Sequence, residues 1–193
     1  MGELKLNSQR TAVIVIDLQK GVVGRSRAPH STSTLIANTV RVLTDARRAE
    51  SLIVLVHVGG ASDGADRLYP EADQPMPRGA PLPPDWSELI AELNRQETDL
   101  VILKRQWGAF YGTDLDLQLR RRKLTTLVLC GISTKFGVER AARDAYERGY
   151  ELIPVSDAMT GLSAESHTDA VERIFPRIGR VRSTDQVIAA FAG

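Results

Sequence analysis

Two charged side chains stand where two apolar stretches of the sequence end. Asp17 closes TAVIVID over 11–17, and Lys104 closes DLVILK over 99–104. A carboxylate at the end of a buried stretch is costly unless it is paired, and an ammonium group is a natural partner. A nearby cation favours the ionised carboxylate, a general base, whereas burial favours the protonated carboxyl, a general acid. The sequence leaves that balance open, together with a purely structural ion pair.

The pattern of apolar residues predicts the elements that must position these two groups. Short β-branched stretches alternate with longer amphipathic ones, which indicates βαβ units. The predicted fold class is α/β, a three-layer α/β/α sandwich with a six-stranded, mainly parallel, Rossmann-like sheet, and residues 1–193 are expected to form one domain. The predicted strands cover 11–17, 52–58, 99–104, 125–131, 151–157 and 178–182, and the predicted helices cover 33–50, 86–96, 114–123, a stretch from 138 onward, 165–175 and 184–191.

Ligands of such sheets bind beyond the carboxyl ends of the strands. Asp17, Gln19, His57, Lys104 and the segment 131–137 follow four different predicted strands and are expected to converge there. Residues 59–84 are rich in Gly, Pro, Asp and Ala and are predicted to form a long loop, either a lid or binding wall or a disordered excursion.

Three motifs in this order resemble the isochorismatase-like hydrolase superfamily, which includes nicotinamidases, other cysteine amidases and isochorismatases. They are VIDLQ, LKRQWGAFYGTDL and LCGISTKFGVERAARDAYERGY, and the resemblance runs from about residue 11 to 182. In cysteine-using members, an aspartate, a lysine and a cysteine form a triad, and these positions match Asp17, Lys104 and Gly137. The resemblance therefore indicates a subgroup with glycine in place of the nucleophilic cysteine.

The resemblance implies a hydrolase that acts on a small molecule without a cofactor. Asp17 would be the general acid or base, and Lys104 would orient it or meet a charge on the substrate. A cis peptide is expected between Ile132 and Ser133, and the N–H groups of Ser133 and Gly137 would form an oxyanion hole. Family members self-associate, so a homo-oligomer is expected.

Isochorismatases also resemble this chain in carrying glycine where their relatives carry cysteine. Their reaction cleaves a vinyl ether: a carboxylic acid protonates the enol carbon, and water adds to the oxocarbenium ion, so the enzyme needs no nucleophile. Gly137 then provides room for a ring or for the attacking water. We therefore favour vinyl-ether cleavage over water-driven amide or imide hydrolysis. A non-catalytic ligand-binding or assembly protein that retains the scaffold is the alternative.

Five further residues are candidates for the substrate pocket, and the aromatic ones suit a flat substrate. Several also have a plain structural interpretation, namely a solvated amide, a structural histidine or core packing. The candidates are Gln19, His57, Trp107, Phe110 and Tyr111.

Composition excludes several other classes of function. The 25 basic and 24 acidic residues nearly cancel, which argues against nucleic-acid and membrane partners. The single cysteine, Cys130, lies in an apolar stretch where a buried thiol is ordinary, and it fits a reducing, cytoplasmic location. His30, His57 and His167 lack the spacing of metal ligands, so we expect no metal.

Overall fold

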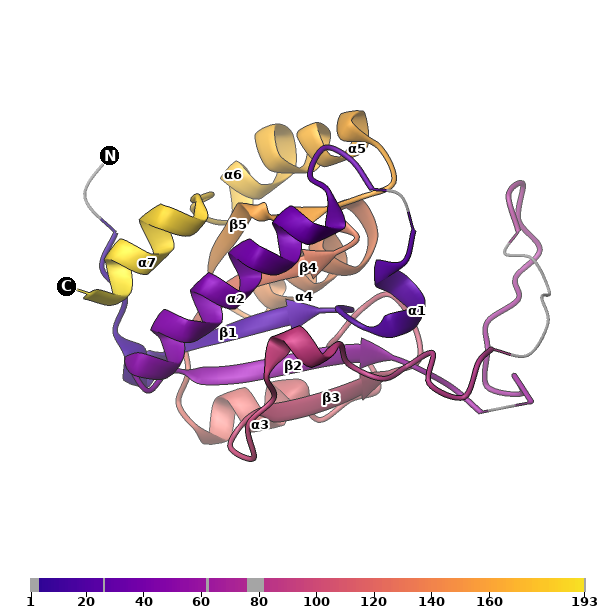
Figure 1. The fold of residues 1–193 in the computed structure, drawn as a ribbon, viewed down its shortest axis with the longest axis horizontal. Coiled ribbons are helices and arrows are strands. Elements are labelled where there is room, and N and C mark those ends of the chain that lie inside the picture. Colours follow the sequence, from indigo (N-terminus) through magenta and orange to yellow (C-terminus); the bar gives the residue numbers. More distant parts are fainter. Residues whose placement is uncertain (1–3, 26, 62, 76–81, 193) are drawn as a thin grey trace.

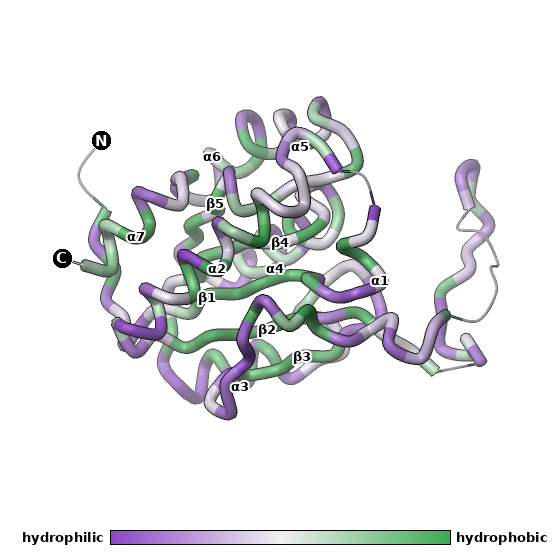
Figure 2. Tube along the Cα trace, in the orientation of Figure 1, coloured by the Kyte–Doolittle hydropathy of each residue, from purple (hydrophilic) through white to green (hydrophobic). Residues whose placement is uncertain are grey.

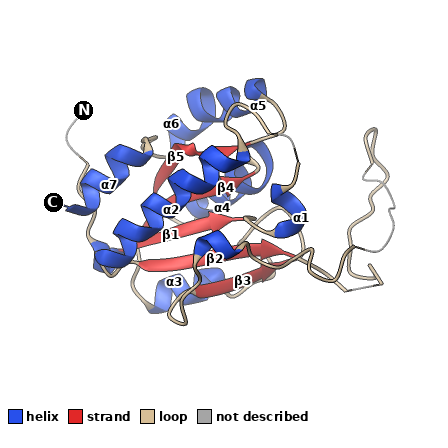
Figure 3. Ribbon diagram, in the orientation of Figure 1, coloured by secondary structure: helices blue, strands red, loops and turns tan. Residues whose placement is uncertain are grey.

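A five-stranded parallel sheet forms the centre of the molecule (Figures 1 and 3). The structure, a computed structural model, describes the chain except residues 1–3, 26, 62, 76–81 and 193. The strand order is β3-β2-β1-β4-β5, so the topological switch lies between β1 and β4. The strands are β1 (Thr11–Ile16), β2 (Leu52–Val58), β3 (Leu100–Lys104), β4 (Thr126–Ile132) and β5 (Glu151–Thr160).

Helices cover both faces of this sheet, which confirms the predicted α/β/α sandwich. In Figure 1, α2 and α7 lie on the face nearer the viewer and α3 and α4 lie behind the sheet. The helices are α1 (Lys20–Val23), α2 (Thr32–Arg48), α3 (Leu115–Arg121), α4 (Glu139–Glu147), α5 (Ala164–Asp169), α6 (Phe175–Ile178) and α7 (Thr184–Ala192), with π-helical turns at Thr134–Val138 and Ala170–Ile174 and short 3₁₀ turns at Ser8–Arg10 and Ala91–Leu93.

Side-chain alternation along the strands explains the two layers. In β1, Ile14 and Ile16 pack with residues of α3 and α4, whereas Val13 and Val15 pack with residues of α2 and α7. Because both faces are covered, the strands are continuously apolar, as Figure 2 shows. Among the described residues, no helix is both long and apolar enough to cross a membrane.

Local capping explains where two of the helices begin. The Oγ atom of Ser31 accepts a hydrogen bond from the N–H of Thr34 at 3.1 Å and caps α2. At α7, the N–H of Ser183 donates to Oε1 of Gln186 at 3.0 Å, and the N–H of Gln186 donates to Oγ of Ser183 at 3.3 Å. This reciprocal pair is a capping box.

The predicted sixth strand, 178–182, is not a strand of the sheet. Its pairing with β5 reduces to one bridge, between Val155 and Arg182. The N–H groups of Arg180 and Arg182 donate to carbonyl groups of β5 at 2.9 and 3.0 Å. Pro154 has no N–H group with which to return a hydrogen bond, so the ladder is interrupted and the sheet has five strands.

The predicted helix over 86–96 is also wrong. Only a 3₁₀ turn, Ala91–Leu93, forms there. Leu89 instead makes an antiparallel bridge with Gln19, which requires extended backbone. Asp85, just before this segment, forms an ion pair of 3.1 Å with Lys20. Tertiary pairing with the segment after β1 therefore overrides the local helical pattern.

The described part of the long loop 59–84 contains neither helix nor strand. It leaves the domain beyond the carboxyl end of β2 and extends away from the sheet (Figure 1). Its tip therefore lies apart from the layers that carry the residues discussed next.

Candidate active site

Asp17 and Lys104 form a buried ion pair at the carboxyl edge of the sheet. The Nζ atom of Lys104 lies 2.8 Å from Oδ2 of Asp17, and the two residues are only 1% and 8% exposed. Nζ also donates a hydrogen bond to the carbonyl oxygen of Trp107 at 2.9 Å. Parallel strands bring these residues together because β1 and β3 flank β2 and end at the same edge.

Burial decides the protonation tendency that the sequence leaves open. The pKa of Asp17 is raised above its ordinary value, because the cost of burying the charged carboxylate outweighs the opposing charge and hydrogen bond of Lys104. Its Oδ1 atom is buried and has no hydrogen-bond partner among the described residues. One oxygen is thus held by Lys104, while the other is available to carry a proton.

The backbone at Asp17 is strained. Its φ of 55° lies in the left-handed region, and its N–H donates to the carbonyl oxygen of Val56 at 2.8 Å. For a residue other than glycine this conformation costs on the order of 1–3 kcal/mol and persists only where surrounding contacts enforce it. The turn directs the chain away from β1 at the point where the carboxyl group is needed.

Gly131 allows β4 to lie close to the end of β1. Its φ is 121°, and a Cβ atom there would stand 2.1 Å from the carbonyl oxygen of Ile16. Only glycine tolerates both conditions. The peptide between Ile132 and Ser133 is cis, and the π-helical turn 134–138 follows directly. The close approach therefore places that turn beside Asp17.

Gly137 lies against Asp17. A Cβ atom at this position would stand 3.0 Å from Cγ2 of Ile16 and 3.2 Å from Oδ2 of Asp17. It would also stand 3.2 Å from the carbonyl oxygen of Ile132, and all three distances are shorter than ordinary van der Waals contacts. A side chain at this position would therefore crowd the end of β1 and the carboxyl group of Asp17. The missing side chain instead lets the turn pack close to the carboxylate.

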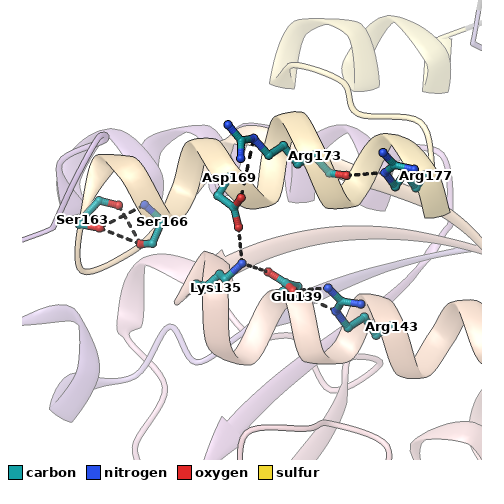
Figure 4. Close-up of polar contacts among 8 residues, drawn as sticks. All are labelled: Lys135, Glu139, Arg143, Ser163, Ser166, Asp169, Arg173 and Arg177. Atoms are coloured by element: carbon teal, nitrogen blue, oxygen red, sulfur yellow. Dashed lines mark hydrogen bonds and ion pairs between the residues drawn. The ribbon is translucent and has the colours of Figure 1, made fainter.

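Helix α5 braces the turn that carries Gly137 (Figure 4). Lys135 lies between two carboxylates, 2.5 Å from Asp169 on α5 and 3.3 Å from Glu139 on α4. Glu139 also pairs with Arg143 at 2.8 Å. The sequence does not predict this brace. The i,i+4 spacing of Lys135 and Glu139 is a local signal for one of its pairs, but nothing local indicates Asp169.

A second contact joins the same turn to α5. The Oγ1 atom of Thr134 and Nδ1 of His167 are 2.9 Å apart, and both side chains are buried. Burial, helped by the neighbouring His30, lowers the pKa of His167 to about 4. The imidazole is therefore neutral near pH 7, as its buried position requires.

Aromatic side chains lie at the surface next to the ion pair. Trp107, whose carbonyl group holds Lys104, is 60% exposed, and its ring centroid lies 4.9 Å from that of Phe136. Phe136 directly precedes Gly137 and was not among the predicted site residues. Tyr111 is also exposed. Trp107 and Phe136 thus present adjacent, tilted rings to solvent.

Phe110 lies in the core, which corrects its assignment to the pocket. It is only 4% exposed, its ring lies 6.2 Å from that of Tyr150, and the Arg148 guanidinium lies over it at 5.0 Å. Tyr150 precedes β5 and so lies toward the amino end of the sheet, opposite the candidate site. Packing behind the loop thus accounts for Phe110.

Gln19 and His57 fasten the segment that follows the long loop. The fully buried amide of Gln19 accepts a hydrogen bond from the N–H of Val58 at 2.7 Å and donates to the carbonyl oxygens of Val58 and Trp86. Nδ1 of His57 lies 2.7 Å from the carbonyl oxygen of Ser87. Both side chains tie residues 86–87 to the end of β2.

The single thiol lies outside this group of residues. Cys130 is buried within β4, on the face covered by α2 and α7. Burial, with a contribution from the negative charge of Asp157, raises the pKa of its thiol far above the ordinary value. The thiolate, which is the nucleophilic form, is therefore strongly disfavoured.

Comparisons with known proteins show the family to which this fold belongs. Residues 11–186 match the isochorismatase domain. The uncharacterized isochorismatase family protein YecD of Escherichia coli O157:H7 is 43% identical over 187 residues, which cover 97% of this chain and 99% of YecD. The ureidoacrylate amidohydrolase RutB of Variovorax paradoxus (strain S110) is 28% identical over 223 residues, which cover 98% of this chain and 84% of RutB.

A solved structure has the same fold as this chain over its whole length. An isochorismatase family protein from Burkholderia thailandensis superposes with a TM-score of 0.92 at 39% identity, and the match covers 100% of both chains. The domain match spans most of the chain, and YecD and the solved structure align over nearly its whole length. The chain therefore belongs to the isochorismatase family of hydrolases.

Proposed function

We propose that this hydrolase cleaves a small molecule without a cysteine nucleophile and that Asp17 is its general acid. One observation carries the proposal: Asp17 is buried, its pKa is raised, and its Oδ1 atom has no partner among the described residues. A carboxyl group that keeps its proton above its ordinary pKa range can donate it to a substrate. Lys104 would then stabilise the carboxylate that the transfer leaves behind.

Vinyl-ether cleavage fits these groups. Asp17 would protonate the terminal enol carbon, and positive charge would form on the carbon that bears the ether oxygen. Water would add to that carbon, and the hemiketal would collapse to a ketone and an alcohol while a proton returns to Asp17. No covalent bond to the enzyme forms, so Gly137 at the position of the family's cysteine is compatible with turnover. The N–H groups of Ser133 and Gly137 would hold an anionic part of the substrate.

Exposed rings next to Lys104 support a flat substrate. Trp107 and Phe136 present adjacent ring faces, and Tyr111 is exposed in the same loop as Trp107. Conjugated or cyclic substrates gain from stacking on such surfaces. We retain Trp107 and Tyr111 as pocket residues and add Phe136. Gln19 and His57 would contribute by holding the wall at residues 86–87.

Amide or imide hydrolysis is the second candidate, and the similarity to an amidohydrolase favours it. Without a thiol, Asp17 would have to deprotonate the attacking water as a general base. The raised pKa of Asp17 weakens that role, because less of the carboxyl group is ionised at a given pH. Vinyl-ether cleavage is therefore preferred. A ligand-binding or assembly protein without turnover remains the alternative outcome.

The test is a screen of purified protein against enol ethers, isochorismate first among them, and against small amides and imides. We expect enol-ether cleavage that a thiol-blocking reagent does not affect, since Cys130 is buried. The variant Asp17→Asn should lose roughly 10²- to 10⁴-fold in rate. The matched control is Glu172→Gln, on the helical segment after α5. Full activity in Asp17→Asn would contradict the assignment of proton transfer to Asp17. Absence of turnover of every compound tested would favour a binding role for the protein.

A further inference from the structure

Three buried polar atoms without partners among the described residues lie near the carboxyl edge of the sheet. They are Oδ1 of Asp17, Oγ of Ser133 and Nε of Arg27. Buried polar atoms in folded proteins nearly always have a hydrogen-bond partner, so such atoms point to a ligand or to water. The proposed mechanism uses Asp17 and the backbone of Ser133. It does not use Arg27.

The chain places Arg27 at the rim of the candidate site. Ala28, the next residue, pairs through its backbone with Gly161 at the end of β5, at 3.2 and 3.1 Å. Gly161 in turn lies against the Ser133 side chain, because a Cβ atom on that glycine would stand 3.3 Å from Oγ of Ser133. The segment that carries Arg27 therefore runs directly beside the turn that contains Ser133 and Gly137.

The guanidinium group of Arg27 has no acidic partner in the described part of the chain. Among the described residues, its hydrogen bond runs from Nη2 to the carbonyl oxygen of Val22 in α1, at 2.7 Å. Nε of Arg47, on α2, likewise has no partner among the described residues, but the Nη2 atom of Arg47 lies 2.7 Å from the carboxylate of Asp99. Burial and the neighbouring positive charge of Arg25 both lower the pKa of Arg27. Within the described part of the chain, neither Arg25 nor Arg27 forms an ion pair with a carboxylate.

We propose that Arg27 binds a carboxylate group of the substrate. A guanidinium group with free donors matches a carboxylate geometrically, and such hydrogen bonds are strong when partly buried. Together with the exposed rings of Trp107 and Phe136, this defines the substrate class as planar, conjugated carboxylates. The inference rests on the proposed function only in that the ligand occupies the same site; it requires no turnover.

The test is binding of two planar probes that differ in charge. Benzoate and benzamide have nearly the same size and shape, and isothermal titration calorimetry measures each without catalysis. We expect benzoate to bind more tightly than benzamide. In Arg27→Gln, the affinity for benzoate should fall roughly tenfold to a hundredfold, whereas the affinity for benzamide should change by less than about twofold. Arg27→Lys should retain part of the affinity for benzoate. Arg173→Gln, on an exposed helix face, should leave the affinities for both ligands unchanged.

A structural role of Arg27 gives a different result. If Arg27 only caps α1 through Val22, the Gln variant should weaken both probes equally or neither. Either outcome, or benzoate binding no tighter than benzamide to the unaltered protein, would overturn the proposal. Because the readout is binding, a lack of hydrolytic activity would contradict the proposed function without touching this inference, and the reverse also holds.

Discussion

Lys104 donates from one ammonium group to both the Oδ2 atom of Asp17, at 2.8 Å, and the carbonyl oxygen of Trp107, at 2.9 Å. The same cation thereby fixes the reactive carboxyl group and the backbone of an exposed aromatic residue. Its burial means that neither contact is shared with solvent. A change at Lys104 should therefore affect proton transfer and substrate contact together.

Replacing Lys104 with Met should move the pH dependence of activity. The charge and hydrogen bond of Lys104 lower the pKa of Asp17 against the larger effect of burial, so their removal raises that pKa further. A reaction that needs protonated Asp17 then persists to higher pH, with a maximal rate reduced roughly tenfold to a hundredfold by loss of the charged hydrogen bond. The pH profile of kcat/KM measures this. An alkaline limb that moves to lower pH would contradict the assignment of Asp17 as an acid.

Replacing Gly137 with Ala should destabilise the protein. The added Cβ atom would stand 3.0 Å from a methyl group of Ile16 and 3.2 Å from Oδ2 of Asp17, and such overpacking typically costs about 1–3 kcal/mol. Urea unfolding gives the free energy. Gly24→Ala is the matched control, because a Cβ atom there meets nothing within 4 Å. Equal stability of the two variants would mean that the turn relaxes freely and that glycine is not required by packing.

Replacing Lys135 with Met tests the brace between α5 and the turn of Gly137. The Lys135 and Asp169 side chains are partly exposed, so the free energy of unfolding should fall by no more than about 1 kcal/mol. If the brace positions the Gly137 N–H, kcat should fall severalfold while KM stays unchanged. Arg173→Met is the control, because Arg173 lies 4.0 Å from the same carboxylate but not on the turn. Equal kcat values in the two variants would mean that the contact between Lys135 and Asp169 is a surface ion pair without a role in catalysis.

Protonation of His167 should destabilise the protein in acid. Its pKa in the folded state is lowered to about 4, so its contribution to stability is fully present above the unfolded value of about 6.5 and is lost as pH falls through about 4. His167→Gln should remove this part of the acid dependence, on the order of 3 kcal/mol between pH 7 and pH 4. Urea unfolding at several pH values measures it. An unchanged slope in His167→Gln would show that other groups cause the loss.

Local patterns predicted much of the fold and the central pair of the site. The strands that form β1 to β4 were placed within a residue or two, and Asp17 and Lys104 meet as expected. The errors arose where distant contacts override local preference. Pro154 interrupts pairing with 178–182, and the bridge to Gln19 keeps the segment before Ala91 extended. Phe110 was misplaced because spacing does not show which side of a loop a ring packs against.

The sequence by itself determined the parallel sheet, its two covering layers and the strand ends at which Asp17 and Lys104 stand. Periodicity and burial on both faces depend on neighbouring residues, which a sequence displays directly. Only the tertiary structure decided that burial outweighs Lys104 at Asp17, that Gly137 is crowded by Ile16, and that α5 braces the turn. The pKa of a buried group depends on atoms from separate strands and helices, and a packing distance joins atoms that are far apart in the sequence. Both are therefore set only once the chain has folded.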